Sequence, residues 1–245
     1  MSALWYEETG LREYCVLDDP HIHWRDKIIS TGGEGGLLTT DDETLWAKAW
    51  SYKDHGKSYD AVYRRNHPPG FRWLHESFGT NLRMNEVQAA IGRKQLRKLD
   101  GWVAARRAHA ALLTALLGEL PCLRIPAPPA DVYHAYYRFY GFVRPATLAD
   151  DWSRDRILQV ATERGLPCFS GSCGEIYREQ AFPLDWRPAQ RLPNAEQLGE
   201  TSLCLLVHPT LSADEVRRQG ETLRDILRLA AGTEKTNSRS NRKAA

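Results

Sequence analysis

The sequence of 245 residues lacks any apolar run that reaches the ~18 residues of a transmembrane helix. It also lacks a signal peptide, because Glu7 and Glu8 stand where such a segment would be basic and then apolar. These two absences predict a cytoplasmic protein with no membrane partner.

The sequence has few groups suited to disulfides or metal sites. Its five cysteines are an odd number, spread along a long chain, so reduced thiols are expected. Cys168 and Cys173 are five positions apart with no second pair nearby, and the eight histidines form no ligand pair at helical spacing. We therefore expect no metal ion.

Excess charge is also missing. The net charge is +2. The charged residues near the end of the chain sum to +3, so the rest of the chain has a net charge of −1. Such a body predicts no nucleic-acid partner. Residues 233–245 are expected to form a disordered basic tail.

A 42% hydrophobic content is enough for a real core. Residues 1–25 show no clear period and remain unassigned, apart from a brief apolar run at 14–17 that is compatible with a strand. Asp41 or Asp42 is expected to cap a helix through Ser51, with Leu45 and Ala49 facing inward. Residues 52–80 are expected to form a long loop.

From residue 85 to 117 the apolar residues recur at helical spacing. This predicts one long amphipathic helix, bent near Gly101, whose outer face is basic. The residues assigned to that solvated face are Arg93, Lys94, Arg97, Lys98, Arg106 and Arg107. A proline-rich connector follows at 121–129 and predicts a boundary between two subdomains.

The second half alternates strand and helix patterns. Residues 133–143 and 202–207 are typical of strands, and 153–164 of a helix capped by Ser153. A last helix is expected from a capping box, Ser212 with Glu215, to about residue 230.

One stretch, residues 26–36, stands out for its chemistry. Lys27 precedes Ser30, Thr31 and a glycine turn, the reverse of the order in a phosphate-binding P-loop. A lysine beside a tight glycine turn suits an amine that binds a carbonyl, as in a Schiff base with pyridoxal phosphate. A glycine-rich hairpin with an exposed lysine is the alternative.

Three further motifs follow in order. They are Lys53-Asp54-His55-Gly56, then Asn81, Arg83, Met84, Asn85, Glu86, Gln88, Ala89, Ala90, Ile91 and Gly92, and finally His134-Ala135-Tyr136. With the Lys27 turn, they resemble the pyridoxal-phosphate-dependent nucleotide-sugar aminotransferases of the DegT/StrS family.

The resemblance implies an α/β fold of the aspartate-aminotransferase type, a partial PLP-transferase type I fold. Residues 26–120 would be a remnant of the large cofactor-binding domain, and 121–232 an α/β small domain.

The resemblance also implies roles for four residues. Lys27 would form the Schiff base with the cofactor and shuttle the proton, and Asn81 would reach the cofactor phosphate of the partner subunit in a homodimer. His55 and His134 would line the cleft for a nucleotide-linked keto-sugar, made for lipopolysaccharide or antibiotic pathways, with glutamate as the usual donor. Asn81 as a residue before a helix cap, and His134 as a strand histidine, are the alternatives.

Only 26 residues precede Lys27. The family's phosphate-binding turn, its ring-stacking aromatic and its ring-nitrogen aspartate would lie ahead of the lysine and are not found there. We therefore expect a truncated aminotransferase that is inactive alone. The alternative is a non-catalytic binding or scaffold module derived from the same fold.

Overall fold

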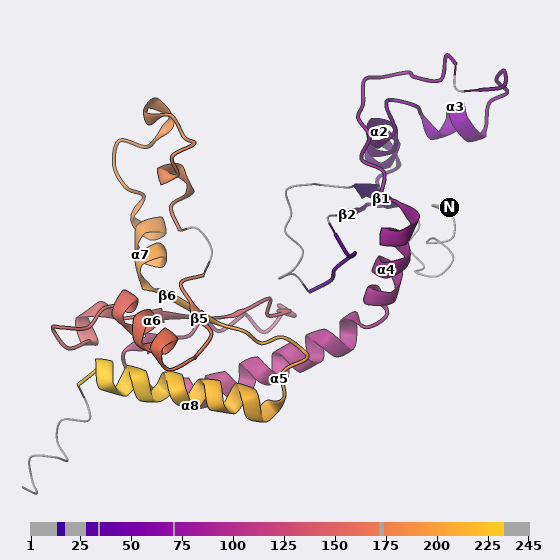
Figure 1. Ribbon diagram of the computed structural model, residues 1–245. Helices are drawn as coiled ribbons and strands as arrows, with labels where there is room; N and C mark the ends of the chain where they lie inside the picture. The colour runs from indigo at the N-terminus through magenta and orange to yellow at the C-terminus, as the bar shows by residue number, and fades with distance from the viewer. Residues whose placement is uncertain (1–13, 18–27, 34, 71, 172–173, 233–245) are drawn as a thin grey trace, which may run out of the picture. The chain divides into compact units, whose positions relative to one another are not determined.

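The computed structural model describes residues 14–17, 28–33, 35–70, 72–171 and 174–232. The chain forms two compact units, residues 1–100 and 101–245, whose elements are drawn in Figure 1. The subdomain boundary near residue 120 stays a prediction. Among the described helices, none combines the length and apolar character that crossing a membrane requires.

The described residues of the first unit form a two-stranded antiparallel sheet and the helices α2, α3 and α4. Strand β1 (Tyr14–Leu17) pairs with β2 (Gly36–Thr39), which confirms the strand at 14–17. The helices are α2 (Glu43–Lys53), α3 (Tyr59–Tyr63) and α4 (Glu86–Leu96).

Helix α2 begins where its cap predicts, but it buries a different face. The Asp42 carboxylate accepts hydrogen bonds from the backbone amides of Thr44 and Leu45 at 2.8 and 3.0 Å. Leu45 is nevertheless 45% exposed, so its predicted inward position is wrong. Helix α2 packs on α3 through aromatic rings instead. The cluster comprises Trp46, Trp50, Tyr59 and Tyr63.

The expected loop at 52–80 is interrupted by structure. Helix α2 continues to Lys53, and Ser58 caps the short α3 by accepting the amide of Ala61 at 3.0 Å. A helix of five residues is too short to show a period in the sequence, which explains why it was missed.

The single helix expected over 85–117 is also wrong. It is two helices, α4 and α5 (Leu99–Leu117), separated at Arg97 and Lys98 rather than bent at Gly101. The amide of Lys98 donates to the carbonyl of Gln95, three residues back, so the last turn tightens and α4 ends. Val87, one of the apolar residues at helical spacing in this stretch, is 71% exposed rather than buried.

The second unit is built on a four-stranded antiparallel sheet in the order β3-β4-β6-β5. Its strands are β3 (Leu123–Arg124), β4 (Phe139–Val143), β5 (Cys168–Phe169) and β6 (Ser202–Leu205). Its helices, besides α5, are α6 (Arg154–Glu163), α7 (Pro193–Thr201) and α8 (Ala213–Ala230). Short 3-10 turns lie at Pro145–Thr147, Ile176–Arg178 and Leu184–Trp186.

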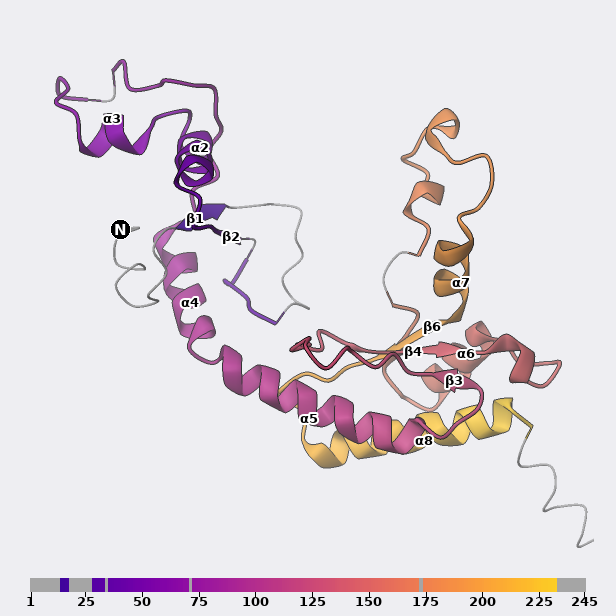
Figure 2. The same ribbon diagram turned by 180° about the vertical axis from the view of Figure 1, so that it is seen from behind.

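Helices α5 and α8 run side by side along this sheet in both views (Figures 1 and 2). Phe139 of β4 pairs with Leu205 of β6, and both side chains are buried in the core. Since side chains alternate between the two faces of a strand, alternate residues of these strands face the core. A Cβ on Gly220 would lie 2.7 Å from Leu116 Cδ1, so this glycine lets α8 approach α5 closely. The three cysteines whose side chains are described, Cys122, Cys168 and Cys204, are free and buried.

The predicted elements of this unit are confirmed with one exception. Ser153 caps α6, Ser212 and Glu215 form the capping box of α8, and β6 is fully buried. The strand expected over 133–143 is wrong in its first half, because β4 begins only at Phe139. Tyr136 has a φ of 48°, a left-handed conformation that no extended strand can contain.

The core position of Leu113 gives a stability prediction. Its side chain is 0% exposed between α5 and α8, whereas Leu184 is 81% exposed in the same unit. Leu113→Ala should lower the free energy of unfolding by about 2–5 kcal/mol, and the matched Leu184→Ala by less than ~0.5 kcal/mol. Chemical denaturation of both variants measures the difference; equal effects would contradict this core.

Ion pairs order the segment between β5 and α7. The Glu175 carboxylate accepts from Arg191 Nε at 2.9 Å and from Arg178 Nη1 at 3.1 Å, and the Tyr177 hydroxyl also donates to it. Arg191 reaches Glu196 and Glu200 on α7 as well. The hydrogen bonds from Arg191 and Tyr177 lower the pKa of Glu175 from 4.5 to about 2.

This lowered pKa predicts an acid dependence. Because the carboxyl is more acidic in the folded state, its stabilisation is present above pH 4.5 and is lost as the pH falls towards 2. Glu175→Gln should therefore flatten the fall in melting temperature across that window, while Glu119→Gln, at an exposed site, should leave it unchanged. A wild-type slope retained in Glu175→Gln would refute the assignment.

Candidate functional site

The glycine turn after Lys27 is a compact bend between residues 28 and 36. Gly32 has a φ of 80°, which a side chain would strain, and Thr31 is 6% exposed. Lys27, the predicted catalytic residue, lies outside the described residues.

The turn packs against the segment that begins α4. A Cβ on Gly32 would lie 2.9 Å from Ile91 Cδ1, and one on Gly35 would lie 2.6 Å from Met84 Cε. These glycines are therefore required for close approach as well as for the bend. Two motifs separated by some fifty positions in the sequence meet here.

The Lys53–Gly56 motif forms a second tight turn. His55 and Gly56 both have positive φ, 56° and 81°. A Cβ on Gly56 would lie 1.6 Å from the carbonyl oxygen of Ser77, so only glycine fits. The His55 amide donates to the carbonyl of Thr80 at 3.1 Å. The turn is thus bound along its length to residues 75–81.

Asn81 lies beside this turn and is exposed, in an antiparallel bridge with Asp54. Arg83 Nε donates to Asn81 Oδ1 at 3.1 Å, so the amide nitrogen of Asn81 is left as its donating side. Asp54 is held by Lys57 Nζ at 3.1 Å and lies 3.5 Å from Arg83 Nη1. The structure therefore brings His55 and Asn81 together.

The sequence did not predict the supporting roles of Asp54, Lys57 and Arg83. Asp54 and Arg83 stand inside the two motifs, which was the available signal. Their contact depends on the bridge between residues 54 and 81, and no local pattern reports such a pairing.

His134 lies in the second unit, on an irregular segment ahead of β4. The amide of Tyr136 donates to His134 Nδ1 at 3.1 Å, and the two rings meet edge to face at 4.4 Å between centroids. The predicted strand position of His134 is wrong, because β4 starts at Phe139.

Two adjacent arginines of α5 hold this segment. Arg106 Nη1 donates to the carbonyls of Tyr136 and Tyr137 at 3.2 and 2.9 Å, and Arg107 Nη1 donates to that of His134 at 3.0 Å. Arg106 was assigned to a solvated basic face, which is wrong: its side chain is 2% exposed. Because most charged side chains of that stretch are basic, the sequence pattern does not distinguish the one arginine that faces inward.

Burial shapes the electrostatics around Arg106. Desolvation lowers the pKa of its guanidinium. Burial lowers the pKa of His208 as well, and the positive charge of Arg106 lowers it further. His109, one turn along α5, is buried with Nδ1 at 3.4 Å from the carbonyl oxygen of Val207.

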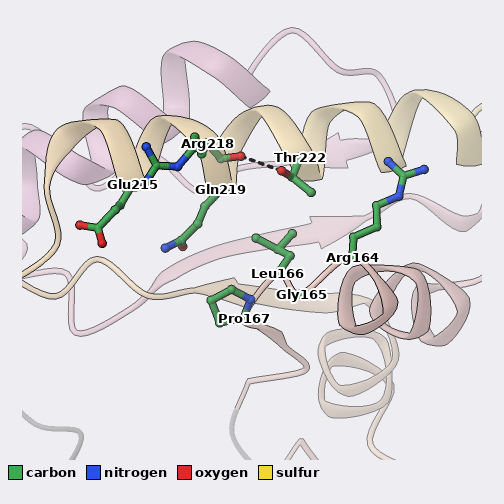
Figure 3. A pocket seen from close by; sticks show the side chains of 8 residues that line it. All are labelled: Arg164, Gly165, Leu166, Pro167, Glu215, Arg218, Gln219 and Thr222. Carbon is green, nitrogen blue, oxygen red and sulfur yellow. Dashed lines mark hydrogen bonds between the residues drawn. The ribbon is translucent and has the colours of Figure 1, made fainter.

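A pocket of about 340 Å³ lies between the end of α6 and one side of α8 (Figure 3). Its described lining residues do not include His55, Asn81 or His134. The Glu215 carboxylate is used by Ser212 in the capping box, and the Thr222 hydroxyl donates to the carbonyl of Arg218. Within the described ranges, no three His, Cys, Asp or Glu side chains gather to hold a metal ion. We therefore place the candidate site on the glycine turn and the Asp54–Asn81 pair.

Comparison with known proteins shows which family the chain resembles. The chain is 28% identical over 191 residues to GDP-perosamine synthase of Escherichia coli O157:H7, covering 78% of this chain and 46% of that protein. It is 30% identical over 203 residues to dTDP-4-dehydro-2,3,6-trideoxy-D-glucose 4-aminotransferase of Saccharopolyspora spinosa, covering 78% and 47%. The chain spans about half the length of the curated relatives it matches.

A solved aminotransferase from Psychrobacter cryohalolentis superposes with a TM-score of 0.77 and 49% identity, over 83% of this chain and 54% of that one. This likeness confirms the predicted α/β fold as part of the PLP-transferase type I fold. The sequence profile of the DegT/DnrJ/EryC1/StrS aminotransferases matches residues 24–224. The chain therefore belongs to the DegT/DnrJ/EryC1/StrS aminotransferase family.

Proposed function

We propose that this chain serves a pyridoxal-phosphate-dependent aminotransferase acting on a nucleotide-linked keto-sugar. The observation that carries the proposal is the packing of the glycine turn after Lys27 against Met84 and Ile91. These residues follow closely after Asn81, whose side-chain oxygen accepts a hydrogen bond from Arg83. The names of two relatives, a GDP-sugar synthase and a dTDP-sugar aminotransferase, support the substrate class.

The described residues fit the phosphate of the cofactor. The amide nitrogen of Asn81 is directed away from Arg83 and can donate to a phosphate oxygen, and Arg83 adds positive charge beside it. Pyridoxal phosphate, when bound, supplies the electron sink for amino transfer.

Lys27 supplies the reactive amine in this proposal. Lys27 would hold the cofactor through its Nζ, and the same amine, once the substrate amine has displaced it, would take up and return the proton that leaves the substrate carbon. An amine with an ordinary pKa near 10.4 needs a desolvated place to do so at neutral pH. In the adjoining bend, Thr31 and Gly35 are buried.

His55 and His134 bind the nucleotide sugar in this proposal. Both are exposed, so both are accessible to a ligand. His134 accepts at Nδ1, so its neutral ring carries the proton on Nε2 and can donate to a phosphate or hydroxyl oxygen. Glutamate is the proposed amino donor, and the proposed assembly is a homodimer in which Asn81 reaches the phosphate bound by the partner subunit.

The role of Lys27 can be tested by reductive trapping. The full chain is incubated with pyridoxal phosphate, reduced with borohydride and digested for mass spectrometry. We expect a covalent adduct on the peptide that carries Lys27, because only an amine condensed with the aldehyde is reduced to a stable product. Lys27→Ala should lose it.

Lys48→Ala, at an exposed site on α2, is the control and should keep the adduct. Adducts spread over several surface lysines, with no excess at Lys27, would contradict the proposal.

The shared site predicts complementation between variants. Lys27→Ala keeps Asn81, and Asn81→Ala keeps Lys27, so a mixed dimer contains one site with both groups intact. Each variant alone should trap little cofactor at a low concentration, whereas a refolded equal mixture should restore about one in four sites. No recovery on mixing, with both variants folded, would mean that Asn81 does not act across subunits.

A further inference from the structure

Arg106 is a large, buried side chain of α5 in the second unit. It is 2% exposed, and its Nη1 divides its hydrogen bonds between two successive carbonyls, those of Tyr136 and Tyr137. Its Nε has no hydrogen-bond partner among the described residues. Burying the guanidinium charge raises its free energy, because burial removes its hydration and the carbonyl dipoles replace only part of that hydration.

What the guanidinium holds is a strained backbone. Tyr136 has a φ of 48°, which costs free energy in any residue except glycine. In this conformation the carbonyls of residues 136 and 137 turn towards α5 instead of towards a neighbouring strand. Arg106 is the donor that satisfies both, so it stabilises the conformation that the tyrosine side chain disfavours.

The same conformation fixes His134. It directs the amide of Tyr136 back to His134 Nδ1 at 3.1 Å, and it places the two rings edge to face. A neutral imidazole that accepts at Nδ1 must carry its proton on Nε2. The orientation and the tautomer of His134 therefore depend on the turn at Tyr136.

We propose that Arg106 is a positioning residue, which holds the left-handed turn at Tyr136 so that His134 presents Nε2–H as a fixed donor. That the acceptor is an oxygen of a nucleotide sugar rests on the proposed function. The positioning itself does not, because it concerns atoms of this chain alone.

The experiment measures the His134 tautomer by nitrogen NMR on the full chain labelled at histidine, without cofactor or substrate. In the parent, His134 should show an unprotonated Nδ1 and a protonated Nε2. Arg106→Gln should lower the ratio of the two tautomers by about five-fold, as expected for the loss of a hydrogen bond worth ~1 kcal/mol. Arg217→Gln, exposed on α8, should leave it unchanged.

A second pair of variants covers the case in which Arg106→Gln does not fold. Arg106→Lys keeps the charge but lacks the planar fork that meets two carbonyls, and Tyr136→Gly removes the cost of the positive φ while keeping the backbone donor. Arg106→Lys should shift the tautomer ratio when residue 136 is Tyr, and several-fold less when it is Gly.

An equal shift in both backgrounds, or no shift in either, would overturn the inference. The proposed function fails separately. A positioned His134 in a chain that traps no cofactor at Lys27 and does not shift its His134 resonances with a dTDP-sugar would refute the function and leave the role of Arg106 intact.

Discussion

Peptide groups that lie outside regular strands and helices still need hydrogen-bond partners, and each segment that carries a predicted site residue obtains them in its own way. In the first unit the partners are other backbone groups: residues 54–57 pair with residues 75–81 as two irregular segments. In the second unit they are side chains, since Arg106 and Arg107 take the carbonyls of the segment before β4. In both segments these hydrogen bonds fix the backbone, while the imidazoles of His55 and His134 remain exposed.

Backbone pairing of this kind demands glycine. Ser77 occupies the space where a Cβ of Gly56 would be, and a Cβ on Gly79 would lie 2.5 Å from the amide nitrogen of Gly56. The glycines at 32 and 35 serve a similar purpose against Ile91 and Met84. The glycines of separate motifs therefore share one cause, which is that two backbone segments, or a backbone and a helix, must approach within van der Waals distance.

Features that depend on neighbouring residues were predictable from the sequence. The caps at Asp42, Ser153 and Ser212 each join a side chain to an amide two or three positions away, so the pattern contains the whole interaction. Burial was less predictable. Leu45 faces solvent because the aromatic cluster takes its place, and Arg106 faces inward because carbonyls thirty positions away need a donor. No periodicity in α2 or α5 contains that information.

The choice of arginine at position 106 follows from the same requirement. Desolvation lowers its pKa, but an arginine stays charged at neutral pH, whereas a buried lysine shifts more readily towards its neutral form. The planar guanidinium also donates to two successive carbonyls, whereas the ammonium of a lysine would be poorly placed to bond both. Because that charge persists, it lowers the pKa of His208 and favours a neutral imidazole there. The positive charge at this end of α5 is therefore carried by a group that does not titrate near neutrality.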